Sequence, residues 1–154
     1  MVVSLNLYLL LFNGLQIALW VFLILAAYID IRKRVYPHSI AVCIAMLSIL
    51  ILIGGDSSPK VKIMYFISSI VTFLILVIFS GLFFYFTGEP GLGAGDIKCI
   101  TTIALVYSWQ SLFAYCLSCF PFVIVCLLAR KHTLPALPFF VITLMFLLYV
   151  NSCG

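Results

Sequence analysis

The chain has 154 residues, of which 66% are hydrophobic and only 8% are charged, and its mean hydropathy is +1.35. A soluble domain carries about 25% charged residues, so composition excludes a water-soluble fold and predicts an integral membrane protein. The formal charge of +4 does not indicate a nucleic-acid partner, because the few basic residues lie between apolar runs, where orientation signals belong. We expect a single membrane-embedded domain over residues 1–154, with room for about six spans of roughly 20–25 residues, loops included.

Six apolar runs follow one another along the chain. They are Leu7–Ile29, Ser39–Ile53, Ile63–Phe86, Ile97–Tyr107, Leu112–Ala129 and Leu137–Val150. A bilayer admits only helices and closed barrels, and these runs do not alternate as barrel strands do, so we expect an all-α fold with about six transmembrane helices. The first and third runs are long enough to span with tilt, whereas the fourth and sixth are short against the usual ~20 residues.

The basic residues predict how the chain is oriented. With the N-terminus outside, the outside loops carry Lys60 and Lys62, and the cytoplasmic loops carry six basic residues. These six are Arg32, Lys33, Arg34, Lys98, Arg130 and Lys131. This bias matches the positive-inside rule. Because Asp30 ends the first span and Asp96 begins the fourth, six spans place both acids at the cytoplasmic face.

The cysteines and histidines give no metal-ligand pattern. Five of the six cysteines fall in apolar runs: Cys43, Cys99, Cys116, Cys119 and Cys126. The C-x-x-C of Cys116 and Cys119 has no second pair, so buried free thiols are expected rather than a zinc site. His38 and His132 stand alone beside a proline or a base. We expect both to be interface residues and no metal to bind.

The stretch Gly88–Lys98 is the least ordinary part of the sequence. Four glycines and one proline precede an apolar run there, which indicates an irregular backbone that other groups can approach closely. The glycines leave the carboxylate of Asp96 open to a neighbouring chain or helix. Local sequence alone favours a plainer interpretation, in which a turn feeds a helix and Asp96 is its N-cap. A dinucleotide-binding loop does not fit, because an apolar span precedes the glycines where a strand is needed.

Asp30 precedes the three bases Arg32, Lys33 and Arg34. Those bases are interpreted mainly as a topology anchor close to anionic lipid headgroups. Taken in isolation, Asp30 is interpreted as a solvated acid in a loop. An acid at the edge of a hydrocarbon layer is nevertheless a functional candidate, and two acids at one face could act as a general acid and base.

Taken together, these motifs resemble the type IV prepilin peptidases, which are membrane aspartic proteases of the GxGD class. The first motif of that family is an Asp followed seven residues later by Pro, as in Asp30 and Pro37, although His38 stands where Asn is usual. The second motif, G-x-G-D-x-K, is matched by Gly93, Gly95, Asp96 and Lys98. A late Pro-Phe stretch that opens the last helix is matched by residues 137–140. The resemblance covers nearly the whole chain.

The sequence departs from the family pattern in two places. Family members often carry a Glu six residues before the second Asp, whereas Glu89 lies seven residues before Asp96 and is therefore only a secondary site candidate. The methyltransferase region of the larger bifunctional members has no counterpart here. The resemblance is therefore to the short, protease-only forms and implies no N-methylation.

The resemblance implies an aspartic endopeptidase in the cytoplasmic membrane of a prokaryote. Its substrate would be a prepilin-like precursor with a basic leader and an apolar helix, and its other partner would be membrane lipid. Asp30 and Asp96 would share a proton around a catalytic water, without a metal or organic cofactor. Pro37, Gly93, Gly95 and Lys98 would shape the site.

The two acids have different predicted roles. Asp96 begins a helix and lies close to Lys98 in sequence, and both features favour its ionised form. Asp30 lies near a helix C-terminus, which favours its protonated form, although the bases from Arg32 to Arg34 oppose this effect. We therefore expect Asp96 to act as the base and Asp30 as the acid.

Two other functions remain open on the sequence. A small proton- or cation-coupled transporter could use Asp30 and Asp96 as ion ligands, and its polar path would have to come from Asn13, Gln16 and Thr72. A non-catalytic membrane subunit of a pilus or secretion assembly would tolerate the loss of both acids.

Overall fold

The structure is a computed structural model that describes residues 2–34, 36–55, 57–88, 93–129 and 136–153. These residues form six α-helices. The helices are α1 (Val2–Lys33), α2 (His38–Gly54), α3 (Pro59–Thr87), α4 (Ala94–Tyr107), α5 (Trp109–Ala129) and α6 (Leu137–Cys153). Each of the six apolar runs lies inside one of them, so the all-α prediction is confirmed.

The helices extend beyond the predicted apolar runs at the two positions that matter most. The first run ends at Ile29, but α1 continues to Lys33 and the Arg34 amide donates to the Asp30 carbonyl over 2.9 Å. The fourth run begins at Ile97, but α4 already begins at Ala94. Both acids are therefore held by helical backbone, because the polar residues that end an apolar run can still complete a helical turn.

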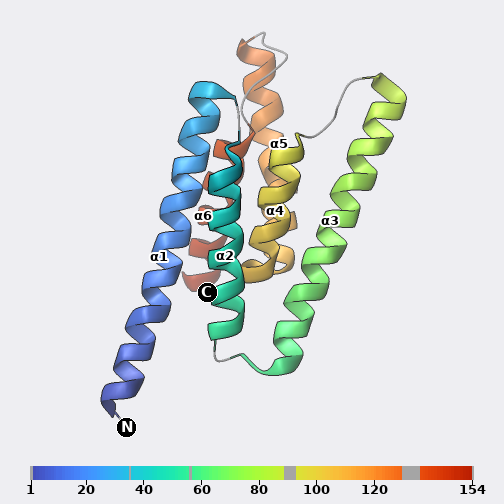
Figure 1. The fold of residues 1–154 in the computed structure, drawn as a ribbon. Helices are drawn as coiled ribbons and strands as arrows, with labels where there is room; N and C mark the ends of the chain where they lie inside the picture. Colours follow the sequence, from blue (N-terminus) through green and yellow to red (C-terminus); the bar gives the residue numbers. More distant parts are fainter. Residues whose placement is uncertain (1, 35, 56, 89–92, 130–135, 154) are drawn as a thin grey trace.

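Consecutive helices run in opposite directions, so the chain crosses the bundle six times (Figure 1). The ends of α1, α3 and α5 and the starts of α2, α4 and α6 lie at the same end of the bundle. The helices α1, α2, α4, α5 and α6 form a closed ring of neighbours. The remaining helix, α3, packs mainly against α4 from outside this ring.

The short helix α4 is central to the bundle because it contacts α2, α3 and α5. Its buried residues Ile97, Ile100, Ile103 and Ala104 recur at helical spacing and face the core. The fully buried residues that join them from the other helices include Leu19, Leu23, Ile44, Phe140 and Leu144. Packing against three helices and this shared core fixes the direction in which the first turn of α4 points.

Two hydroxyl groups tie α3 to α4. Ser69 Oγ donates to the Thr101 carbonyl over 2.7 Å, and Ser68 Oγ donates to the Ala104 carbonyl over 3.5 Å. Small hydroxyl side chains are common between membrane helices, because they allow close approach and satisfy a polar group without water. These bonds hold the outer helix against the helix that carries Asp96.

The outer surface of the bundle is strongly apolar. Many large side chains are exposed, among them Leu10 at 70%, Phe86 at 79% and Phe120 at 73%. Two helical segments, Leu10–Lys33 and Pro59–Phe86, are long and apolar enough to cross a membrane by length and composition. The helices α2, α5 and α6 add shorter apolar segments. A surface of this kind is compatible with a membrane protein and would be costly in water.

Candidate active site

Asp30 and Asp96 lie near each other although they come from distant parts of the sequence. Asp30 is in the last turn of α1 and Asp96 is in the first turn of α4, and these two helix ends lie at the same end of the bundle (Figure 1). The negative charge of Asp30 is close enough to disfavour ionisation of the Asp96 carboxyl group. The structure therefore places the two carboxyl groups within electrostatic range of each other.

The Asp30 carboxylate faces the start of α6. The backbone N–H of Leu137, the first residue of that helix, donates a hydrogen bond to it. The first backbone N–H groups of a helix have no partner inside the helix, and they carry the positive end of its dipole. The charge of Arg34 also acts on Asp30. Burial has the largest effect on this half-buried carboxyl group and disfavours its ionised form, whereas the Leu137 N–H and the charge of Arg34 offset part of that effect.

Asp96 has a different position from the one that local sequence favoured. The N-cap of α4 is Gly93, which has an extended conformation, and the Ile97 amide donates to the Gly93 carbonyl over 3.2 Å. Asp96 is therefore not the N-cap, and that interpretation is wrong. A Cβ added at Gly93 would lie 3.3 Å from Asp96 Oδ2. The missing side chain at Gly93 thus leaves space beside the carboxylate.

Asp96 precedes the apolar segment of α4, and its carboxyl group is partly shielded from solvent. Burial, followed by the neighbouring charge of Asp30, raises the pKa of Asp96 to about 6. The expectation that the helix start and Lys98 would favour ionised Asp96 is therefore wrong. Lys98 is exposed, and residues two positions apart on a helix do not face each other.

Tyr36, in the connection between α1 and α2, lies against the first turn of α4. A Cβ added at Gly95 would lie 2.6 Å from Tyr36 Cβ, closer than such atoms approach in proteins. The Tyr36 hydroxyl donates to the sulfur of Cys99, and the charge of Asp96 acts on Tyr36. Sequence reasoning identified Gly95 but missed Tyr36, because nothing in the sequence says what approaches the glycine.

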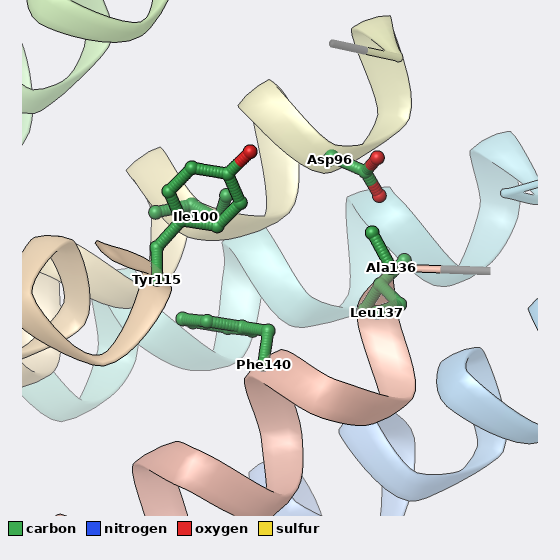
Figure 2. Close-up of a pocket in the computed structure, with 6 residues that line it drawn as sticks. All are labelled: Asp96, Ile100, Tyr115, Ala136, Leu137 and Phe140. Carbon is green, nitrogen blue, oxygen red and sulfur yellow. The ribbon is translucent and has the colours of Figure 1, made fainter. Parts of the chain in front are cut away.

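A pocket opens beside Asp96 between α4, α5 and α6. It is lined by Asp96, Ile100, Tyr115, Ala136, Leu137 and Phe140. Figure 2 shows the Asp96 carboxylate directed toward Ala136 and Leu137, with the rings of Tyr115 and Phe140 on the other side of the pocket. Residues 137–140 were singled out by their Pro-Phe pattern, whereas Tyr115 was missed. This narrow, mostly apolar pocket adjoins the carboxyl group of Asp96.

The other predicted residues occupy varied positions. Pro37 is the N-cap of α2, and its carbonyl accepts the Ala41 amide over 3.1 Å, so it fixes where α2 begins. His38 is exposed. Glu89 lies outside the described residues, as do Arg130, Lys131 and His132. Four of the predicted thiols are free, but the expectation that they are buried holds only for Cys99, since Cys43 and Cys119 are half-buried and Cys116 is exposed. Within the described part of the chain, no three His, Cys, Asp or Glu side chains form a group that could hold a metal ion.

Comparison with known proteins gives the family. Residues 17–150 match the profile of the type IV leader peptidase family. The chain is 30% identical over 105 residues to the prepilin peptidase EppA of Methanocaldococcus jannaschii. The aligned region covers 68% of this chain and 27% of that protein. The chain thus matches about a quarter of the length of that relative. No solved structure matches this chain. Because the family profile extends over most of the sequence, the chain belongs to the type IV leader peptidase family.

Proposed function

We propose that this protein is an aspartic endopeptidase that removes the leader from a prepilin-like precursor, with Asp30 and Asp96 as its catalytic pair. The observation that carries the proposal is the interaction between these two carboxyl groups, which reach one end of the bundle from α1 and α4. Membership of a leader peptidase family supports the choice of substrate. A carboxyl pair of this kind can hydrolyse a peptide bond with water alone as the co-reactant.

The surroundings of the two acids support a different catalytic role for each. Asp30 is the less buried acid, and the Leu137 N–H and the charge of Arg34 offset part of the effect of its burial, so we take it as the ionised member and the general base. Asp96 is the more shielded member, and its raised pKa of about 6 makes it the protonated general acid. This assignment reverses the roles expected from the sequence.

The reaction then follows from these protonation states. Asp30 takes a proton from a water molecule, and the oxygen of that water attacks the carbonyl carbon of the scissile bond. Asp96 donates its proton to the carbonyl oxygen, which gives a neutral tetrahedral intermediate. When the C–N bond breaks, the proton held by Asp30 passes to the leaving nitrogen, and a hydroxyl proton of the intermediate returns to Asp96. Both acids regain their starting states.

The membrane setting defines how a substrate would bind. We place the carboxyl pair at the cytoplasmic face, with the N-terminus outside and six spans, because this orientation puts most basic residues inside. A precursor would keep its apolar helix in the lipid and present the extended segment before that helix to the carboxyl pair. Its basic leader would remain in the cytoplasm, on the same side as the pair.

The proposal is tested by co-expressing the protein with candidate prepilins and measuring the precursor masses. The wild-type protein should reduce the mass of its substrate by that of a short leader, and Asp30→Asn and Asp96→Asn should each abolish this change. Asp56→Asn is the matched control, because it makes the same chemical change in the segment between α2 and α3. Normal processing by either active-site variant would remove the carboxyl pair from the mechanism and support a non-catalytic role.

A further inference from the structure

We propose that Tyr36 is a positioning residue that fixes the first turn of α4, and with it Asp96, against the connection that follows Asp30. This inference rests on the proposed function of the Asp30–Asp96 pair. Tyr36 touches neither the reacting water nor the substrate in this account. Its contribution is to set where one carboxyl group stands relative to the other.

The first line of evidence is the contact with Gly95. The Cβ that any other residue would carry at this position would lie 2.6 Å from Tyr36 Cβ, 3.2 Å from Cγ and 3.3 Å from Cδ1. Three atoms of one side chain therefore pack directly on the backbone of α4, one residue before Asp96. Such close packing leaves little freedom for the first turn to shift toward the connection.

The second line of evidence is the hydrogen bond at the far end of the ring. The Tyr36 hydroxyl donates to the sulfur of Cys99, which is 1% exposed and lies one helical turn beyond Gly95. The ring thus contacts α4 at two levels, on the backbone at Gly95 and through the hydroxyl at Cys99. Two contacts on one helix define both the position and the rotation of its first turn.

The position of Tyr36 in the chain gives these contacts a consequence for the site. Tyr36 is six residues after Asp30 and directly before Pro37, which caps α2. The segment that leaves the turn carrying Asp30 is therefore the one that packs on the turn carrying Asp96. Rigid support of this kind matters for catalysis, because a displacement of about 1 Å can cost roughly 100-fold in rate.

Tyr36 lies close enough to Asp96 for the charge of that acid to act on the phenol, so we expect the ring to contribute to the burial of Asp96. Burial, followed by the neighbouring Cys99, raises the pKa of Tyr36, so the phenol is neutral and remains a hydrogen-bond donor. Four titratable groups interact electrostatically with Asp96. They are Asp30 on α1, Tyr36 between α1 and α2, Cys99 on α4 and Tyr115 on α5. From α6, the pocket residues beside Asp96 are apolar, and Lys98 on α4 is exposed.

The first test compares two substitutions of Tyr36 in the purified, detergent-solubilised protein. Tyr36→Phe keeps the ring against Gly95 and should retain cleavage within about 3-fold of wild type. Tyr36→Ala removes the ring and should lower kcat by about 10- to 100-fold with little change in KM, since the carboxyl pair loses its alignment. Water would then reach Asp96, so the alkaline limb of the pH–rate profile should move to lower pH in Tyr36→Ala only.

A second measurement does not depend on cleavage. The infrared carbonyl band of protonated Asp96, assigned by its loss in Asp96→Asn, should titrate at lower pH in Tyr36→Ala than in wild type or Tyr36→Phe. If Tyr36→Ala does not fold, Tyr36→Leu, which keeps an apolar side chain but not the ring, serves the same comparison.

A double-mutant cycle tests the contact itself. Gly95→Ala should impair cleavage in the wild-type background, because its Cβ meets Tyr36 Cβ. Tyr36→Gly removes the three atoms that cause the clash, so the double variant should be less impaired than the product of the two single effects. Gly81→Ala is the matched control, because a Cβ at this glycine of α3 meets nothing within 4 Å.

The outcomes separate this inference from the proposed function. If Tyr36→Ala cleaves like wild type and leaves both the pH–rate profile and the infrared titration unchanged, Tyr36 does not position Asp96, although the peptidase assignment stands. The positioning role of Tyr36 would also be overturned if the effects of Gly95→Ala and Tyr36→Gly on the cleavage rate simply multiplied in the double variant. If the wild-type protein cleaves no prepilin while the infrared titration shifts as expected, the positioning role survives and the proposed function fails.

Discussion

The carboxyl group of Asp96 lies at the start of a helix, where the backbone dipole favours a negative charge. Its pKa is nevertheless raised to about 6, because burial disfavours the charged form and the nearby charge of Asp30 adds to this effect. The magnitudes decide the outcome: a surface dipole contribution is about 0.3–1 kcal/mol, whereas a shift of two pKa units corresponds to about 3 kcal/mol.

This environment predicts a pH dependence. The general acid must be protonated, so kcat/KM should fall as the pH rises through about 6, and it should fall again at lower pH where Asp30, the general base, becomes protonated. The measurement is the rate of cleavage of a prepilin peptide by the purified protein from pH 5 to about 8. An activity that stays constant up to pH 8 would show that protonated Asp96 is not required.

Single residues differ in how far the sequence could predict them. Asp30, Asp96 and Gly95 were identified from spacing, because each belongs to a short motif. Tyr36 and Tyr115 were missed, because their relation to Asp96 depends on which helices pack together. The protonation order that we propose differs from the expected one for the same reason: burial is a property of the bundle, and local sequence carries only the dipole and the neighbouring charges.

Among the helices, the start of α6 has the most direct role at the site. The Leu137 N–H donates to Asp30, and the same residue lines the pocket beside Asp96. The apolar runs predicted that this helix begins at Leu137, as it does, but not that its first N–H group meets Asp30. That contact requires α1 and α6 to be neighbours, which only the closed ring of helices establishes.

A pair of substitutions separates the backbone donor from the side chain. Leu137→Pro removes the N–H at the first position of the helix, where proline is well tolerated, and also removes the buried leucine side chain. Leu137→Ala removes most of the side chain and keeps the N–H. We expect Leu137→Pro to lower kcat by about 10-fold more than Leu137→Ala, as a hydrogen bond to a charged group is worth about 1.5–3 kcal/mol. Equal kcat values would show that the N–H does not support Asp30.

At the scale of the whole molecule, the alternating helices bring the two acid-bearing ends together. Composition and the six apolar runs predicted the number and type of helices, because apolar residues in this proportion cannot be hidden in a soluble fold. The ring of five helices with α3 outside it could not be predicted, since hydropathy gives spans but not their neighbours. Among the residues that the structure describes, α1 and α3 contain segments that qualify as spans by length and composition.

The orientation is therefore a separate prediction for the short helices. If all six helices cross the membrane with the N-terminus outside, alkaline phosphatase fused after Ser58 or at the C-terminus should be active, whereas a fusion after Gly88 should be inactive. Green fluorescent protein at the same positions should give the opposite pattern. If the C-terminal phosphatase fusion is inactive and the C-terminal green fluorescent protein fusion is fluorescent, one of the helices after Gly88 does not cross the membrane. The shortest of these helices is α4.

The central claim is that Asp30 and Asp96 act as one catalytic unit. Its most direct test is the rate of prepilin cleavage by wild type, Asp30→Asn, Asp96→Asn and the double variant, with Asp56→Asn as the control. Residues that act as a unit are strongly non-additive, so each single substitution should reduce kcat by about 1,000-fold or more, and the double variant should be no slower than the slower single one. Substantial cleavage by either single variant, or reductions that multiply in the double variant, would contradict the account.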